Sequence, residues 1–146
     1  MNSELSAIES LSFPGKRNLR TGWWTLLVFV CLGILLEIGL GFRGHFYMDV
    51  SQQTRRLMWR LSHAHGTLLA LLNILYGLIA AHWHSAAGQQ FGSRALLAAG
   101  WLIPGGFFLA GLFAYQSTPG LATLLIPPGA ILLAIGLFLA TRNTKE

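Results

Sequence analysis

Four long apolar segments constrain the fold of this chain more than any other feature of its sequence. A transmembrane helix needs about 20 apolar residues to cross roughly 30 Å of hydrocarbon. Four segments reach or approach that length: residues 23–42, 57–83, 95–115 and 121–141. Only 10% of the 146 residues are charged, against about 25% in a typical soluble domain. The sequence therefore predicts an all-α integral membrane protein, a bundle of four transmembrane helices.

The rest of the chain is predicted to form short tails and loops around one domain. We expect an N-terminal tail over residues 1–20, a single four-span domain over 21–142 and a C-terminal tail over 143–146. The first apolar segment has no small-residue cleavage pattern behind it, so we expect a retained anchor rather than a signal peptide. The lone cysteine, Cys31, lies inside that segment and permits no intramolecular disulfide.

The positive charges indicate how the spans are oriented. An even number of spans places both termini on one side of the membrane, and basic flanks favour the cytoplasm. Six basic residues lie on the side of the termini and four on the other: Lys16, Arg17, Arg20, Arg94, Arg142 and Lys145 against Arg43, Arg55, Arg56 and Arg60. We therefore expect a protein of the bacterial inner (plasma) membrane with both termini in the cytoplasm.

The same flanks account for the net charge of +5, which therefore indicates no nucleic-acid partner. The expected partner is the lipid bilayer, and a homodimer or a larger membrane complex stays open. No motif is strong enough to name an enzymatic reaction.

The third and fourth segments each contain a proline motif. Residues 102–106 read LIPGG and residues 125–129 read LIPPG. Proline inside a helix removes one backbone hydrogen bond and bends the helix, so we expect kinks in both spans. Paired breaks in two antiparallel spans can mark a binding site at a repeat interface, or they can be ordinary packing kinks.

The second apolar segment begins with the richest group of ionisable residues, RRLMWRLSHAHG over 55–66. At 100° per residue, Arg56, Arg60, His63 and Thr67 fall on one helix face, and Asn73 lies on the adjoining strip of small residues. Ionisable groups in a membrane span are costly and mark functional sites. This face is our candidate site for a ligand or for proton handling.

The second histidine of the motif, His65, points elsewhere. Two residues correspond to 200° of helical rotation, so His63 and His65 cannot face the same way. Metal ligands on a helix are instead separated by three or four residues. We expect His65 to contact a different neighbour, and the H-x-H pair is a poor metal site.

The first span contributes a carboxylate at a matching depth. Gly33, Glu37 and Gly41 repeat every four residues, which places Glu37 on a small-residue face near the end of that helix. In an antiparallel hairpin, Glu37 then lies at the level of Arg60 and His63. Glu37 either forms a structural clamp with Arg60 or handles protons or a ligand together with His63.

The cofactor is left open by these residues. Arginine donors suit a carboxylate or phosphate, so a small anionic or quinone-like ligand is the preferred hypothesis. A copper site from His45, Met48 and His63 is a minor alternative. Haem is a further possibility, although the first, third and fourth spans contain no histidine to serve as a second axial ligand.

The stretch WRLSHAHGTLLALLN resembles a family of small four-span bacterial membrane proteins of uncharacterised function, with an arginine-rich His-Ala-His-Gly second helix. More distantly, the layout is similar to hydroxylaminobenzene mutase and to haem-copper oxidase-like membrane proteins. The resemblance to the mutase implies that His63 and His65 would carry its function.

Three functions follow from the sequence as hypotheses. The first is binding of a small ligand in a polar pocket between the first two helices. The second is an accessory or assembly subunit of a larger membrane complex, whose polar face docks a partner. The third is a small proton-coupled transporter that uses Glu37 as its exchanging carboxylate.

Overall fold

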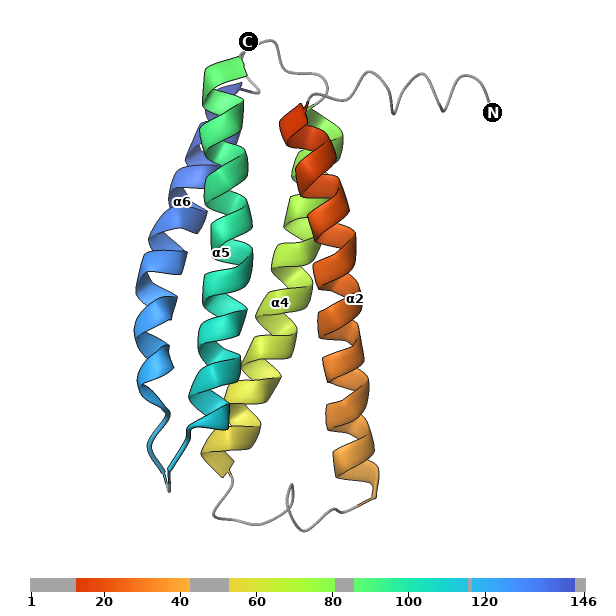
Figure 1. Ribbon diagram of the computed structural model, residues 1–146, viewed down its shortest axis with the longest axis vertical. Coiled ribbons are helices and arrows are strands. Elements are labelled where there is room, and N and C mark those ends of the chain that lie inside the picture. The colour runs from red at the N-terminus through yellow and green to blue at the C-terminus, as the bar shows by residue number, and fades with distance from the viewer. Residues whose placement is uncertain (1–12, 43–52, 81–85, 116, 144–146) are drawn as a thin grey trace, which may run out of the picture.

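The computed structural model describes residues 13–42, 53–80, 86–115 and 117–143. They form four long helices, α2 (Phe13–Gly41), α4 (Gln53–Ile79), α5 (Ala86–Leu112) and α6 (Ile126–Asn143). A short 3-10 helix, η3 (Leu121–Leu125), precedes α6. The helices run antiparallel and side by side (Figure 1). The predicted all-α four-helix bundle is confirmed, and all four helices are long and apolar enough to cross a membrane.

Helices α2 and α5 begin before the apolar segments that predicted them. Helix α2 begins at Phe13 rather than near residue 23, so part of the expected N-terminal tail is helical. Helix α5 likewise begins at Ala86 rather than near residue 95. Apolar length marks the part of a helix that fits hydrocarbon, whereas the backbone stays helical into the polar region as long as its hydrogen bonds are satisfied.

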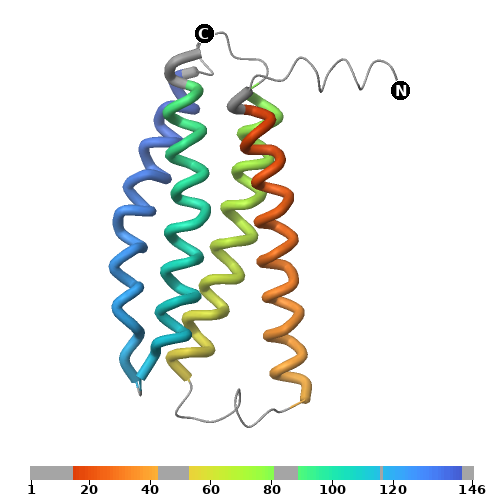
Figure 2. Tube along the Cα trace, in the orientation of Figure 1, coloured from red at the N-terminus to blue at the C-terminus, as the bar shows by residue number. Residues whose placement is uncertain are grey.

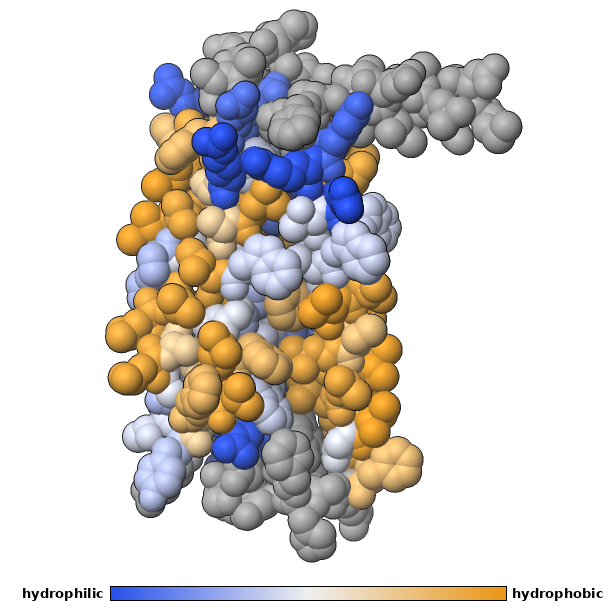
Figure 3. Space-filling view, in the orientation of Figure 1, coloured by the Kyte–Doolittle hydropathy of each residue, from blue (hydrophilic) through white to orange (hydrophobic). Residues whose placement is uncertain are grey.

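Helices α4 and α5 form the middle of the bundle. Helix α2 packs mainly on α4, and α6 packs mainly on α5 (Figure 2). In the apolar windows of α4 and α5, 44% and 50% of residues are buried, against 17% and 11% in α2 and α6. The core lies along the middle helices, where Leu69 and Tyr76 pack near Leu96, Ala99 and Ile103. The outer helices therefore present most of their apolar surface outwards (Figure 3).

Glycines allow α2 and α4 to approach closely. A Cβ atom built on Gly22 would lie 3.0 Å from the carbonyl oxygen of Ala70. One built on Gly77 would lie 2.8 Å from the carbonyl oxygen of Gly15. Backbone atoms cannot move aside easily, so these positions require glycine. Close approach through small residues is the usual source of helix association in membranes, where van der Waals packing is the main attraction.

The two proline motifs occupy different places. Pro104 lies inside α5 and is buried, and its carbonyl oxygen accepts a hydrogen bond of 2.8 Å from the hydroxyl of Ser62 in α4. Pro127 and Pro128 lie instead in the first turn of α6, where the missing N–H removes no helical hydrogen bond. The irregularity of the fourth span is thus the junction between η3 and α6, and the two breaks are not symmetric.

Candidate functional site

Helices α2 and α4 enclose a groove of about 600 Å³ near the C-terminal end of α2 and the N-terminal end of α4. Glu37 lines it from α2, and Arg60 and His63 line it from α4. The remaining walls are mostly apolar, for example Val30, Ile34, Leu36, Ile38 and Phe42. The groove brings together three of the residues singled out from the sequence, and it encloses them in a mainly hydrocarbon surface.

His63 is held in one orientation by its surroundings. Its Nδ1 lies 2.7 Å from the carbonyl oxygen of Phe29 in α2. A carbonyl oxygen only accepts hydrogen bonds, so Nδ1 carries the proton and donates it. The ring lies against Gly33, where a Cβ atom would come within 2.6 Å of Nδ1. The other ring nitrogen, Nε2, is therefore the one left to accept or to bind a proton.

Glu37 and Arg60 are exposed at the groove. Within the part of the chain that the structure describes, neither side chain forms an ion pair or a hydrogen bond with another residue. Both charges line the same cavity without meeting. The carboxylate and the guanidinium are therefore both available to a ligand in the groove. In a clamp they would instead be paired with each other.

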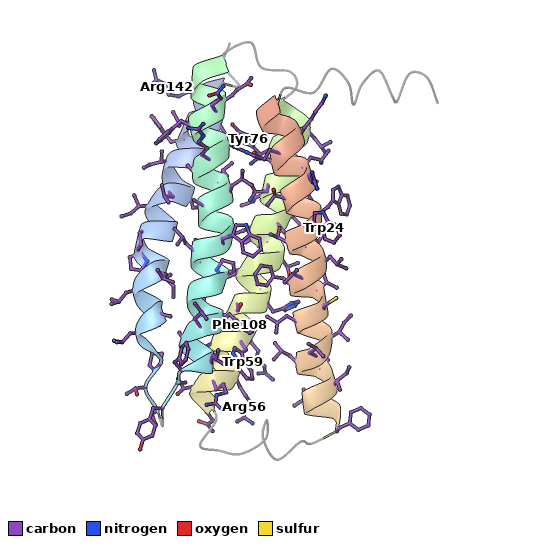
Figure 4. All side chains as sticks on the ribbon, in the orientation of Figure 1. Trp24, Arg56, Trp59, Tyr76, Phe108 and Arg142 are labelled. Carbon is purple, nitrogen blue, oxygen red and sulfur yellow. The ribbon has the colours of Figure 1, made fainter. Side chains whose placement is uncertain are left out.

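Arg56 and Thr67 share the helix face of His63 but do not line the groove. Arg56 is half-buried near the start of α4 (Figure 4). The hydroxyl of Thr67 donates to the carbonyl oxygen of His63 at 2.8 Å. Helical spacing puts these residues on one face of α4, but of that face only Arg60 and His63 line the groove.

His65 faces α5 instead of the groove. Its ring lies 4.9 Å from the ring of Phe107, centroid to centroid. Its Nδ1 lies 2.8 Å from the carbonyl oxygen of Leu61 and donates to it. The two histidines of the motif therefore contact different helices, as their 200° separation requires.

Asn73 belongs to a buried polar network rather than to the groove. Its Nδ2 donates to the carbonyl oxygens of Leu69 at 2.9 Å and Leu96 at 3.3 Å. Its Oδ1 accepts 2.8 Å from Nδ2 of Asn18 in α2. The hydroxyl of Ser93 in α5 donates to Oδ1 of Asn18. This network ties three helices together in the core.

The residues Asn18 and Ser93 were missed by the sequence reasoning. Both lie outside the apolar segments that were assigned to the spans, and both are fully buried. The signal that could have revealed them is Pro14, since proline is favoured in the first turn of a helix. A helix that starts there carries Asn18 into the bundle opposite Asn73.

The sequence did not reveal a second group of contacts, which joins the start of α4 to the end of α5. Arg55 donates from Nε to the carbonyl oxygen of Gly111 at 3.1 Å. The indole of Trp59 donates to the carbonyl oxygen of Phe108 at 3.2 Å, and its ring stacks on that of Phe108 (Figure 4). These contacts satisfy carbonyl groups at the C-terminal end of α5, so we assign them a structural role.

Metal binding finds no support in the described part of the chain. It contains no group of three histidine, cysteine, aspartate or glutamate residues that could hold a metal ion. His45 and Met48, two of the three residues of the copper hypothesis, lie outside the described residues.

Comparison with known proteins adds no assignment. No protein-family model matches the chain, and no match was found among curated proteins or among solved structures. A helical bundle by itself hosts many functions, so the function of this chain depends on the chemistry of the groove.

Proposed function

We propose that this chain is a multi-pass protein of the bacterial inner membrane that binds a small quinone-like ligand in the groove between α2 and α4. The observation that carries the proposal is the convergence of Glu37, Arg60 and His63 on one mainly apolar cavity of about 600 Å³. Ligand sites typically combine apolar walls with a few polar groups that fix the orientation of the ligand.

The polar groups of the groove suit a head with both acceptors and donors. The guanidinium of Arg60 can donate to a carbonyl oxygen of a quinone. The carboxylate of Glu37 and Nε2 of His63 can each accept from a quinol hydroxyl. The apolar walls, among them Ile34 and Ile38, suit an isoprenoid tail. The same groove could thus bind both the oxidised and the reduced form.

Other ligands fit the groove less well. A fully anionic ligand would lie beside the carboxylate of Glu37, and like charges repel strongly where water is scarce. A haem could take one axial nitrogen from His63, but His65 contacts α5 and cannot supply the second within the same groove. A quinone needs neither a net charge nor a metal ligand set.

The orientation that we propose places both termini in the cytoplasm. The start of α2 and the end of α6 lie at the same end of the bundle (Figure 1), and that end also carries Arg17, Arg20, Arg94 and Arg142. A bias of basic residues towards the cytoplasm sets the orientation of most membrane proteins. The groove then opens near the outer leaflet.

Two other functions remain as alternatives. In an accessory subunit, the partner would be a larger membrane protein or a second copy of this chain. In a proton-coupled transporter, Glu37 would exchange a proton for a substrate, and Arg60 beside it disfavours a cationic one.

The test is a survey of what the protein carries from the membrane. We expect protein purified in mild detergent to contain a quinone in near-stoichiometric amount, detected by solvent extraction and mass spectrometry. Protein that carries no quinone and binds no added decylubiquinone would contradict the proposal. A haem absorption band would favour haem binding, and co-purification of a larger membrane protein in stoichiometric amount would favour the accessory subunit.

A further inference from the structure

A second groove, of about 490 Å³, lies on α2 near the end of the bundle where α2 begins and α6 ends. It is lined by Lys16, Arg17, Arg20, Thr21 and Trp24, and none of these residues is acidic. Spacings of four residues place them on one strip of the helix surface. Figure 3 shows hydrophilic residues gathered at this end of the molecule, above an apolar surface.

A contact with α5 holds the side chain of Arg17 in this groove. Its Nη2 donates to the hydroxyl of Ser93 in α5 at 3.0 Å, and Ser93 in turn donates to Asn18. Nε of Arg17 is buried and has no hydrogen-bond partner among the described residues. A guanidinium has five N–H donors. One of them goes to Ser93, and the position of the others is set before any ligand arrives, which reduces the entropy lost on binding.

The length of α2 and its exposed tryptophans indicate that the groove lies at the depth of the lipid headgroups. Helix α2 has 29 residues and is about 43 Å long at 1.5 Å per residue, longer than the roughly 30 Å of hydrocarbon. Trp23 and Trp24 are 59% and 62% exposed, and tryptophan prefers the membrane interface. The segment from Lys16 to Thr21 precedes these tryptophans in α2 and so lies farther from the centre of the membrane, at the level where phosphate groups are found.

We propose that this groove binds a phosphate group, presented by the head of an anionic phospholipid. Arg17 and Arg20 would donate to the phosphate oxygens in charge-assisted hydrogen bonds, and the hydroxyl of Thr21 offers a further donor. Below Trp24 the helix surface continues with the exposed Leu27 and Val28, which suit the acyl chains. Basic pockets at the cytoplasmic side of membrane helices are the usual recognition sites for such headgroups.

The experiment counts lipids that stay bound to the full chain. The protein is reconstituted in nanodiscs of phosphatidylcholine and phosphatidylglycerol, released, and analysed by native mass spectrometry. Arg20→Gln is the main variant, because Arg20 forms no hydrogen bond with another described residue and its loss should not disturb folding. Arg17→Gln is the second variant. Arg142→Gln is the control, since Arg142 lies on α6 at the same end of the bundle (Figure 4).

We expect the wild type to retain phosphatidylglycerol in preference to phosphatidylcholine. Arg20→Gln should lower that preference about tenfold, the effect of losing one charge-assisted hydrogen bond, while Arg142→Gln leaves it unchanged. Equal retention by the wild type and Arg20→Gln would overturn the proposal.

A separate arm distinguishes the source of the phosphate. Inorganic phosphate in large excess should leave the bound lipid in place. If inorganic phosphate binds on its own, displaces the lipid and loses its affinity in Arg20→Gln, the ligand is free phosphate and the assignment to a lipid headgroup is wrong.

Discussion

The imidazole of His63 lies directly against Gly33 of the neighbouring helix, so that a Cβ atom at Gly33 would be 2.6 Å from Nδ1 and 2.9 Å from Nε2. The absence of a side chain at Gly33 is what lets the ring reach the carbonyl oxygen of Phe29. The orientation of the central polar group of the groove therefore depends on a glycine in the opposite helix.

Gly33→Ala tests this dependence. The added methyl group should push the ring of His63 out of its position and break its hydrogen bond to Phe29. Because a side chain can move aside, we expect a modest loss of stability, about 1 kcal/mol, but a clear loss of quinone affinity. Stability is measured by unfolding in detergent, and affinity by titration with decylubiquinone.

The matched control is Gly105→Ala in α5, which does not line the groove. A Cβ atom at Gly105 meets nothing within 4 Å, so alanine there should leave affinity unchanged and should not destabilise the helix. Equal quinone affinity in Gly33→Ala and Gly105→Ala would contradict the role assigned to Gly33.

A second glycine tests the packing of α2 on α4. At Gly77 a Cβ atom would lie 2.8 Å from the carbonyl oxygen of Gly15 and 2.9 Å from the backbone nitrogen of Leu19. Since backbone cannot move aside as a side chain does, Gly77→Ala should destabilise the protein by about 1 to 3 kcal/mol. Gly105→Ala is the control, because its Cβ meets nothing within 4 Å. Unfolding titrations that give both variants the same stability would show that the close approach is not required.

The buried network predicts energetic coupling between two asparagines. Asn18 donates to Asn73 inside the bundle at 2.8 Å, so either single change to alanine leaves a buried partner unsatisfied. The double variant Asn18→Ala/Asn73→Ala should therefore be less destabilised than the sum of the two single variants, by about 0.6 to 1.7 kcal/mol, the usual range for polar contacts in membrane proteins. Strictly additive unfolding free energies would mean that the contact contributes nothing.

Glu37→Gln separates a ligand role from a structural clamp. Glu37 is exposed and has no ion-pair partner among the described residues. We therefore expect the unfolding free energy of the Glu37→Gln protein to stay within about 0.5 kcal/mol of the wild type, while quinol binding weakens. A variant that fails to accumulate in the membrane would instead support the clamp.

The sequence predicted the fold from hydrophobicity but not the length of the helices. Apolar runs located all four helices, because only satisfied helical backbone can cross hydrocarbon. They did not locate the start of α2 at Phe13, because half of residues 13–20 are polar and their helical state depends on packing. The burial of Asn18 against Asn73 provides that packing and is a contact between distant parts of the chain.

The candidate site could be predicted in part for a similar reason. Helical spacing and antiparallel depth are geometric, so Glu37, Arg60 and His63 could be placed at one level before the structure was known, and they line one groove. Which helix covers each face is not encoded in spacing. Asn73 and His65 lie on the same helix as His63. Asn73 nevertheless belongs to the buried polar network, and His65 contacts α5.

The central claim is that the groove on the side of α2, and not the other face of α4, binds a quinone. The most direct measurement is a titration of wild type, His63→Gln and His65→Gln with decylubiquinone, followed by quenching of tryptophan fluorescence. The two histidines lie on the same helix and both donate Nδ1–H to a carbonyl oxygen, so the pair is matched in all but its surroundings. We predict about tenfold weaker binding for His63→Gln and wild-type binding for His65→Gln. Equal loss in both variants, or loss only in His65→Gln, would contradict the account.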